Sequence, residues 1–119
     1  MNIVILGAGQ VGSELSAILA SDHDVTLIDL NQEKLQKISD HHDLKTICGN
    51  ACYPKTLEQA EIEKSDLAIA MTQYDEVNMV ACQMIKHISK RTKTMARIRA
   101  TQYLGGKGCL LYTSPSPRD

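Results

Sequence analysis

Short apolar runs of strand length alternate with amphipathic segments along most of the chain. The run from Ile3 to Leu6 is followed by Val11, Leu15 and Ile18, which recur at the spacing of one helical face. This alternation is typical of an α/β fold. We expect strands at 2–6, 25–28, 44–48, 67–71 and 94–98. The pattern therefore predicts a doubly wound parallel sheet of the Rossmann type, with strand order 3-2-1-4-5 and helices on both faces.

Local signals mark where the helices between these strands begin. Asn31 is a suitable N-cap for the helix after the second strand, and Pro54 fits the first turn of a short third helix. A fourth helix is expected at 75–89, because Asp75 and Glu76 suit its positive end and its apolar positions form one stripe.

The periodic pattern ends near residue 105, where Gly105, Gly106 and Gly108 surround Lys107. Residues 109–119 have neither a helical nor a strand period, and they resemble the translated read-through of a sequencing adapter. We therefore expect a folded domain at 1–104 and a disordered, non-native tail at 105–119. The sheet would then be truncated after the fifth strand, whose exposed edge would favour association.

Composition narrows the function classes. Hydrophobic residues make up 43% and charged residues 23% of the chain, as in ordinary globular domains, and one compact domain is all that 119 residues support. The formal net charge of -1 and the scarcity of aromatic residues argue against a nucleic-acid partner. No apolar run is long enough to span a bilayer and no secretion signal is recognisable, so we expect a cytoplasmic chain without direct membrane insertion.

The cysteines and histidines do not form a convincing metal site. Cys48 and Cys52 are loosely spaced beside His41 and His42, and Cys48 falls inside an expected strand. We expect no metal, and we expect these thiols and Cys82 to be buried packing residues. No arrangement of nucleophile and base is readable, so no catalytic residue is assigned.

A glycine-rich string, Gly7-Ala8-Gly9-Gln10-Val11-Gly12, joins the first strand to the first helix. Gly7 would permit the tight turn, Gly9 would let the backbone approach a pyrophosphate, and Gly12 would let the helix pack closely on the sheet. The helix N-terminus would then present N–H groups to the phosphates. This string predicts a dinucleotide site because it lies between a strand and a helix.

Asp29 ends the second strand, where an acidic residue accepts hydrogen bonds from a ribose diol. Its charge would repel a 2′-phosphate, and Lys34 is the one nearby cation. The expected cofactor is therefore NAD(H) rather than its phosphorylated form.

Ligands of doubly wound sheets lie outside the carboxyl ends of the strands. Asp75 and Asn78 follow the fourth strand and either cap the helix or face the ligand. The arginines after the fifth strand are either ligand contacts or surface residues. The candidate residues beyond the third, fourth and fifth strands are Gly49 and Asn50, Thr72 and Gln73, and Arg97 and Arg99.

Taken together, these strings resemble the regulator-of-potassium-conductance (RCK or KTN) family, most closely the N-terminal domain of Trk-type potassium-uptake peripheral subunits. The resemblance covers nearly all of residues 1–104. It rests on the glycine string, Asp29, Gly49, the run from Thr72 to Cys82, and Ala96-Arg97-Ile98-Arg99.

The resemblance implies a cytoplasmic regulatory subunit, peripheral on the inner face of the plasma membrane, that docks on a membrane potassium transporter. It also implies a ligand, NAD(H) or an adenine nucleotide such as ATP or ADP, and a homo-oligomer, a dimer or tetramer. The implied contacts are the pyrophosphate at Gly7 to Val11, the ribose at Asp29, the ligand's centre at Thr72 and Gln73, and a phosphate or the neighbouring subunit at Arg97.

Two features depart from the family pattern. Asn50 stands where many relatives have an acid, at the adenine side of the site. The family normally carries a sixth strand and a C-terminal ligand-binding domain beyond the region covered here.

A rival interpretation of the function is the N-terminal fragment of an NAD-dependent dehydrogenase, because a fold alone does not fix function. The Asp75-Glu76-x-Asn78 and Arg97-x-Arg99 strings favour the regulatory family.

Overall fold

The computed structural model describes residues 1–100 and 110–113. Its parallel strands are β1 (Asn2–Leu6), β2 (Asp24–Asp29), β3 (Lys45–Cys48), β4 (Leu67–Ala70) and β5 (Lys93–Arg97). The helices are α1 (Gln10–Leu19), α2 (Gln32–Ser39), α3 (Pro54–Gln59) and α4 (Asp75–Ile88), with a 3-10 turn η1 (Ile62–Lys64). The sheet order begins β3-β2-β1-β4-β5, and each neighbouring pair among these five is parallel. The predicted doubly wound α/β fold is confirmed.

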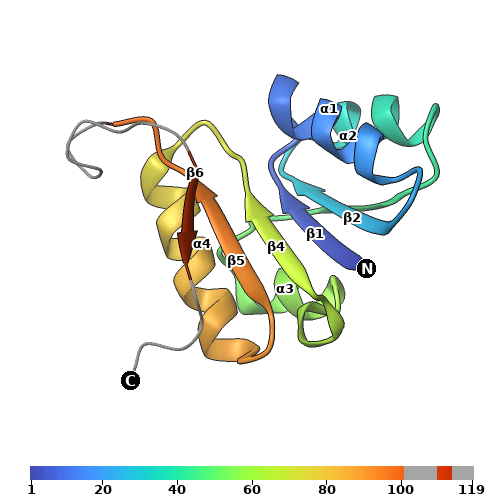
Figure 1. Ribbon diagram of the computed structural model, residues 1–119. Coiled ribbons are helices and arrows are strands. Elements are labelled where there is room, and N and C mark those ends of the chain that lie inside the picture. Colours follow the sequence, from blue (N-terminus) through green and yellow to red (C-terminus); the bar gives the residue numbers. More distant parts are fainter. Residues whose placement is uncertain (101–109, 114–119) are drawn as a thin grey trace.

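A further strand, β6 (Leu110–Thr113), pairs antiparallel with β5, in the register Thr94 to Thr113 and Arg97 to Leu110. Figure 1 shows β6 running opposite to β5 at the edge of the sheet. The parallel part of the sheet therefore ends at β5, as predicted, and the open N–H and C=O groups of β5 pair with residues 110–113 of the segment expected to be a disordered tail. The rest of the expected tail lies outside the described residues.

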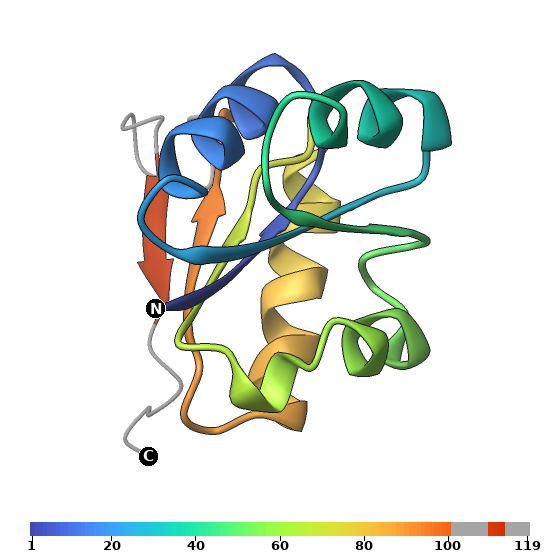
Figure 2. The ribbon, with the colours of Figure 1, turned by 90° about the vertical axis from the view of Figure 1, so that its right-hand side faces the viewer.

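Helices cover both faces of the sheet, as Figures 1 and 2 show. On the side of α1 and α2, the core contains Ile5, Leu27 and Leu35, each with an exposed fraction of 0%. On the side of α3 and α4, Leu6 and Ile85 belong to a second buried cluster. Alternate residues of each strand feed the two clusters, since successive side chains point to opposite faces. Within the described residues, no helix is long and apolar enough to cross a membrane.

The predicted helix starts are present in the structure. The Asn31 side chain accepts a hydrogen bond from the Lys34 N–H at 3.1 Å, and Pro54 occupies the first turn of α3. The sequence did not predict η1, which Glu61 precedes in a left-handed conformation with φ of 56°. This turn lets the chain pass from α3 to β4 on the second face.

The order of strands places β1 beside both β2 and β4. From β1 the chain leaves toward β2 by way of α1, whereas β4 is reached only after the crossover through α3. The loops after β1 and β4 consequently diverge to opposite faces of the sheet. This divergence opens a crevice at the carboxyl ends of the strands, where doubly wound sheets bind ligands.

Candidate functional site

The loop between β1 and α1 has the conformation that its glycines predict. Gly7 has a φ of 112°, and a Cβ built on it would lie 2.8 Å from the backbone nitrogen of Thr72. A Cβ on Gly12 would overlap the carbonyl oxygen of Gly7. A side chain at Gly7 would therefore be strained by its backbone and crowded by the end of β4, and one at Gly12 would be crowded within the turn itself.

Gly9 differs from these two glycines because a Cβ built on it would meet no atom within 4 Å. Gly9 is the N-cap of α1, and no side chain caps the first turn of this helix. The N–H groups of that turn lack partners within the helix and favour an anion. The open space at Gly9 lies where such an anion would approach.

Asp29 is tied to this loop. Its Oδ1 accepts a hydrogen bond from the Ala8 N–H at 2.8 Å, and its Oδ2 accepts one from the Asn31 N–H at 2.8 Å. Each carboxylate oxygen has two lone pairs, so both oxygens retain acceptor capacity for ribose hydroxyls. The carboxylate thus holds the glycine loop and also faces the cavity that the loop borders.

A cavity of about 660 Å³ lies at the carboxyl ends of the parallel strands. Most candidate residues of the sequence analysis line it, Arg99 included, whereas Ala8, Gly12, Asp75 and Asn78 do not. The cavity is lined from all five parallel strand ends. The predicted lining residues are Gly7, Gly9, Gln10, Val11, Asp29, Gly49, Asn50, Thr72, Gln73 and Arg97.

The loop after β4 is held by Asn78 of α4, which is fully buried. Asn78 Oδ1 accepts hydrogen bonds from Thr72 N at 2.9 Å and from Thr72 Oγ1 at 2.6 Å. Asn78 Nδ2 donates to the carbonyl oxygens of Thr72 at 3.1 Å and Arg97 at 2.8 Å. Asn78 therefore neither caps α4 nor lines the cavity; it joins the ends of β4 and β5.

Asp75 makes the corresponding contacts one helical turn earlier. Its Oδ1 accepts from the Arg99 N–H at 2.9 Å and its Oδ2 from the Ala100 N–H at 2.7 Å. These backbone donors, first Arg99 and then Ala100, lower the pKa of the Asp75 carboxyl, and the charges of Arg99 and Arg97 add to the effect. Asp75 therefore stays ionised beside two arginines of the cavity.

The loop after β3 carries the residues that the family resemblance assigns to the adenine side. A Cβ on Gly49 would lie 2.9 Å from Thr56 Oγ1, so α3 packs directly against this turn. Asn50 Oδ1 accepts a hydrogen bond from the Cys52 N–H at 2.8 Å, which closes a local turn of the kind that Asn favours. An amide at position 50 thus stabilises the loop without adding negative charge to the cavity.

Sequence reasoning missed several residues that line the same cavity. Tyr74 and Val77 come from the start of α4, Met71 from the end of β4, and Leu30 from the turn after β2. Tyr74 OH accepts a hydrogen bond from Gln73 Nε2 at 2.9 Å. These residues carry no motif of their own, because an isolated apolar or aromatic residue after a strand resembles any core or surface position. The spacing from each strand end was the only available signal.

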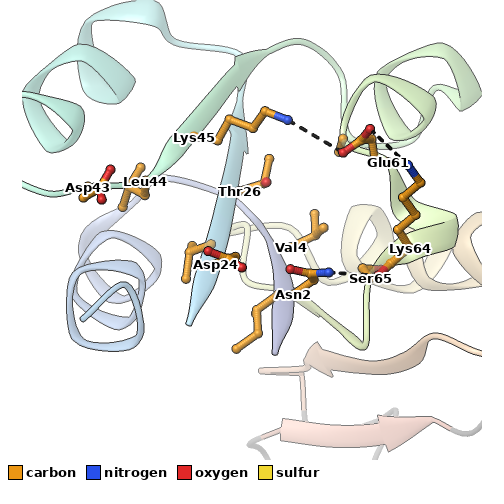
Figure 3. Close-up of a pocket in the computed structure, with 13 residues that line it drawn as sticks. Asn2, Val4, Asp24, Thr26, Asp43, Leu44, Lys45, Glu61, Lys64 and Ser65 are labelled. Carbon is orange, nitrogen blue, oxygen red and sulfur yellow. Dashed lines mark hydrogen bonds and ion pairs between the residues drawn. The ribbon is translucent and has the colours of Figure 1, made fainter. Parts of the chain in front are cut away.

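A second cavity, of about 390 Å³, lies at the opposite ends of the strands, and none of the predicted site residues line it. Figure 3 shows Lys45 and Lys64 reaching toward Glu61 there. Their ion pairs with Glu61 measure 3.9 and 3.8 Å and are exposed, so they contribute little. Mixed charges line this cavity, and no glycine loop or free helix N-terminus borders it.

The expectation for the cysteines holds only in part. Cys82 is buried, and burial raises its thiol pKa to about 11. Cys52 is half-buried and lines the larger cavity. Cys48 is exposed, so its expected burial is wrong: it ends β3, which is the outermost strand on that side of the sheet among the described residues. No group of three or more metal-ligating side chains occurs among the described residues.

The sheet order, the glycine loop and the cavity define the class of this chain: it is an α/β domain of the Rossmann type, with its cavity where that class binds nucleotides. The TrkA-N domain model matches residues 3–106, and the chain belongs to this family.

Curated relatives agree with this assignment. The chain is 43% identical over 109 residues to the "Trk system potassium uptake protein TrkA" of Halomonas elongata, covering 91% of this chain and 24% of that protein. It is 42% identical over 120 residues to the protein of the same name from Haemophilus influenzae, covering 100% of this chain and 26% of that protein. The chain thus spans about a quarter of the length of these relatives.

Two solved structures share the fold at low sequence identity. The TrkA-N domain of the inner membrane protein ybaL from Escherichia coli has a TM-score of 0.79 at 18% identity, covering 88% of this chain and 78% of that one. The Shewanella denitrificans Kef C-terminal domain in AMP-bound form has a TM-score of 0.72 at 19% identity, covering 91% and 69%.

Proposed function

We propose that this chain is the nucleotide-sensing domain of a regulatory subunit that controls potassium uptake through a membrane transporter. The observation that carries the proposal is the cavity at the carboxyl ends of the strands, which the glycine loop, Asp29 and Arg97 border together. Membership of the TrkA-N family and relatives named as potassium uptake proteins support the transport role.

Each group of site residues is proposed to bind a different part of the nucleotide. The first-turn N–H groups of α1 at Gly9 to Val11 take the pyrophosphate. Asp29 accepts from the ribose hydroxyls, and Thr72 and Gln73 contact the centre of the ligand. Arg97 forms charge-assisted hydrogen bonds with a phosphate. These roles use groups that line one cavity from the carboxyl ends of four strands, β1, β2, β4 and β5.

NAD(H) is the proposed ligand, because Asp29 offers a negative charge where a 2′-phosphate would lie. Lys34 also lines the cavity, but it is a single flexible cation and lacks the planar fork that grips two phosphate oxygens. An adenine nucleotide is the second candidate, since the related fold of the Kef C-terminal domain was solved with AMP.

The regulatory role is proposed in place of an enzymatic one. The residues that line the cavity carry carboxylate, amide, hydroxyl and cationic groups, and none of their nucleophilic side chains is hydrogen-bonded to a basic one. We propose that the protein containing this domain is cytoplasmic, forms homo-oligomers and docks on the inner side of a potassium transporter. If the rival is right, the full-length protein that contains this domain would instead oxidise NADH once a hydride acceptor is supplied.

Titration of the purified chain with NADH, NADPH, ATP, ADP and AMP tests the ligand. We expect measurable binding with NADH tighter than NADPH. Equal or tighter binding of ATP would transfer the assignment to the adenine nucleotides, and absence of binding by all five would contradict nucleotide sensing.

Complementation tests the transport role. The gene that encodes this domain is expressed in bacteria whose own Trk regulatory subunit has been deleted, and growth at low external potassium is followed. We expect restored growth with the wild-type gene and loss of restoration with Gly12→Val. Failure of the well-expressed wild-type protein to restore uptake would contradict the transport role without affecting nucleotide binding.

A further inference from the structure

The first turn of α4 carries two side chains that lie on one face of the helix, Asp75 and Asn78, three positions apart. Both reach the backbone at the end of β5, and Asn78 also reaches the end of β4. Neither residue lines the nucleotide cavity. Their hydrogen-bond partners Thr72, Arg97 and Arg99 do line it.

We infer that Asn78 and Asp75 are positioning residues of the nucleotide site: they hold Thr72, Arg97 and Arg99 on adjacent loops so that these three residues converge on one ligand. The inference rests on the proposed function, since it assumes that the cavity receives a nucleotide. Asn78 and Asp75 lie outside the cavity, so their effect on nucleotide binding passes entirely through the residues that line it.

Asn78 can hold both loops because its side-chain amide makes hydrogen bonds through both its oxygen and its nitrogen. Its Oδ1 accepts two hydrogen bonds and its Nδ2 donates two, all between 2.6 and 3.1 Å. An amide has this combination of donors and acceptors, and a carboxylate or an apolar side chain of similar size does not. The exposed fraction of Asn78 is 0%, so water cannot replace a lost partner without rearrangement.

Asp75 contributes charge as well as geometry. Two guanidinium groups near one phosphate repel each other before the ligand arrives, and a carboxylate beside them offsets that repulsion. Asp75 binds the backbone N–H of Arg99 and of Ala100, so it fixes the path of the chain directly after the arginines. The side chain at position 75 thus orients the arginines without occupying the space of the ligand.

The test is a double-mutant cycle on NADH affinity. Asn78→Asp keeps the shape of the side chain and removes its two donated hydrogen bonds. We expect this substitution to weaken NADH binding about 10-fold in the wild type. In an Arg97→Ala background the same substitution should weaken binding less than about 3-fold, because the residue that it positions is gone.

A matched control is Gln83→Glu, the same amide-to-carboxylate change at an exposed position of α4. We expect it to leave NADH affinity unchanged.

A second ligand separates positioning from a general structural role. Adenosine, which has no phosphate, should bind wild type and Asn78→Asp equally, because Arg97 acts on the phosphates. A merely structural role for Asn78 would weaken adenosine and NADH alike.

If Asn78→Asp does not fold, the half-buried Asp75 and the exposed Arg99 give the same test. Asp75→Asn and Arg99→Ala are combined in a second cycle, with Glu58→Gln on α3 as control. Equal losses of NADH affinity in both backgrounds, in whichever cycle is measured, would overturn the inference while leaving the proposed function intact. Absence of nucleotide binding by the wild type would overturn both.

Discussion

The carboxylate of Asp29 accepts a hydrogen bond from the backbone N–H of Ala8 at 2.8 Å, so the acid at the end of β2 holds the loop that follows β1. One side chain thereby links two separate parts of the candidate site. A substitution at position 29 will affect loop order and ligand preference together unless the hydrogen bond is kept.

Asp29→Asn keeps an oxygen that can accept from Ala8 and removes the negative charge. We expect the preference for NADH over NADPH to fall by about 10-fold, because repulsion of the 2′-phosphate is lost. Calorimetric titration with both ligands measures the ratio. Glu33→Gln, on the exposed face of α2, serves as control, and an unchanged ratio for Asp29→Asn would refute the assignment of Asp29 as the discriminator.

A glycine-to-alanine substitution should have different effects on stability at Gly9 and at Gly12. Gly12→Ala forces a Cβ onto the Gly7 carbonyl, and we expect a loss of about 2 kcal/mol, or roughly 10 °C in Tm. Gly9→Ala places its Cβ in open space, so stability should be nearly unchanged while NADH affinity falls. Thermal unfolding and NADH titration of both variants separate the effects. Strong destabilisation by Gly9→Ala would show that the loop conformation differs.

Arg97 has a phosphate role in the proposed site. Arg97→Ala should weaken NADH binding about 10-fold to 150-fold, since a charge-assisted hydrogen bond is lost. Arg97→Lys should restore affinity only in part, because an ammonium lacks the planar fork of arginine. Lys93→Ala, at the opposite end of β5, is the control. Unchanged affinity with altered sedimentation would assign Arg97 to a subunit contact instead.

Asp66 predicts a dependence of stability on pH. Its carboxylate accepts from the Asn2 N–H at 2.8 Å and from Arg91 Nη2 at 2.7 Å, and these contacts lower its pKa. A carboxyl whose folded pKa is depressed contributes stability above its unfolded pKa of about 3.9 and loses that contribution as pH falls through the folded value. Thermal unfolding between pH 6 and pH 2.5 should therefore show a steeper acid loss for wild type than for Asp66→Asn. Equal slopes would contradict this account, and Asp22→Asn should behave as wild type.

The cysteines should react with a thiol reagent in the order set by their accessibility and their thiolate fraction. In a Cys109→Ser background, Cys48 should react first and Cys82 only on unfolding, since Cys82 is buried with a pKa of about 11. Cys52 lines the larger cavity, and burial raises its pKa. NADH should slow the labelling of Cys52 and leave Cys48 unaffected. Equal protection of both thiols would indicate a ligand elsewhere or a global change.

The sequence predicted those parts of the site that depend on local pattern. Hydrophobic periodicity placed all five parallel strands to within a residue or two, and the glycine spacing located the loop because each glycine has its own steric reason. The cap at Asn31 followed from residue type alone. These features require only a few consecutive residues.

Features that depend on neighbours distant in the chain were not predictable. The four hydrogen bonds of Asn78 need the ends of β4 and β5 side by side, and the sequence left this residue open between capping and ligand contact. The exposure of Cys48 follows from the edge position of β3. The pairing of β6 with β5 joins residues across a segment that has no periodic pattern.

The cavity draws its lining from the first strand and from the last parallel strand, which lie at opposite ends of the amino-acid order of the domain. During synthesis on the ribosome, the loop that would receive the pyrophosphate emerges long before Arg97. A nascent chain that ends before β5 therefore lacks part of the pocket lining, and a ligand that binds this pocket would stabilise only the completed domain. Such a ligand would favour finished chains over partial ones.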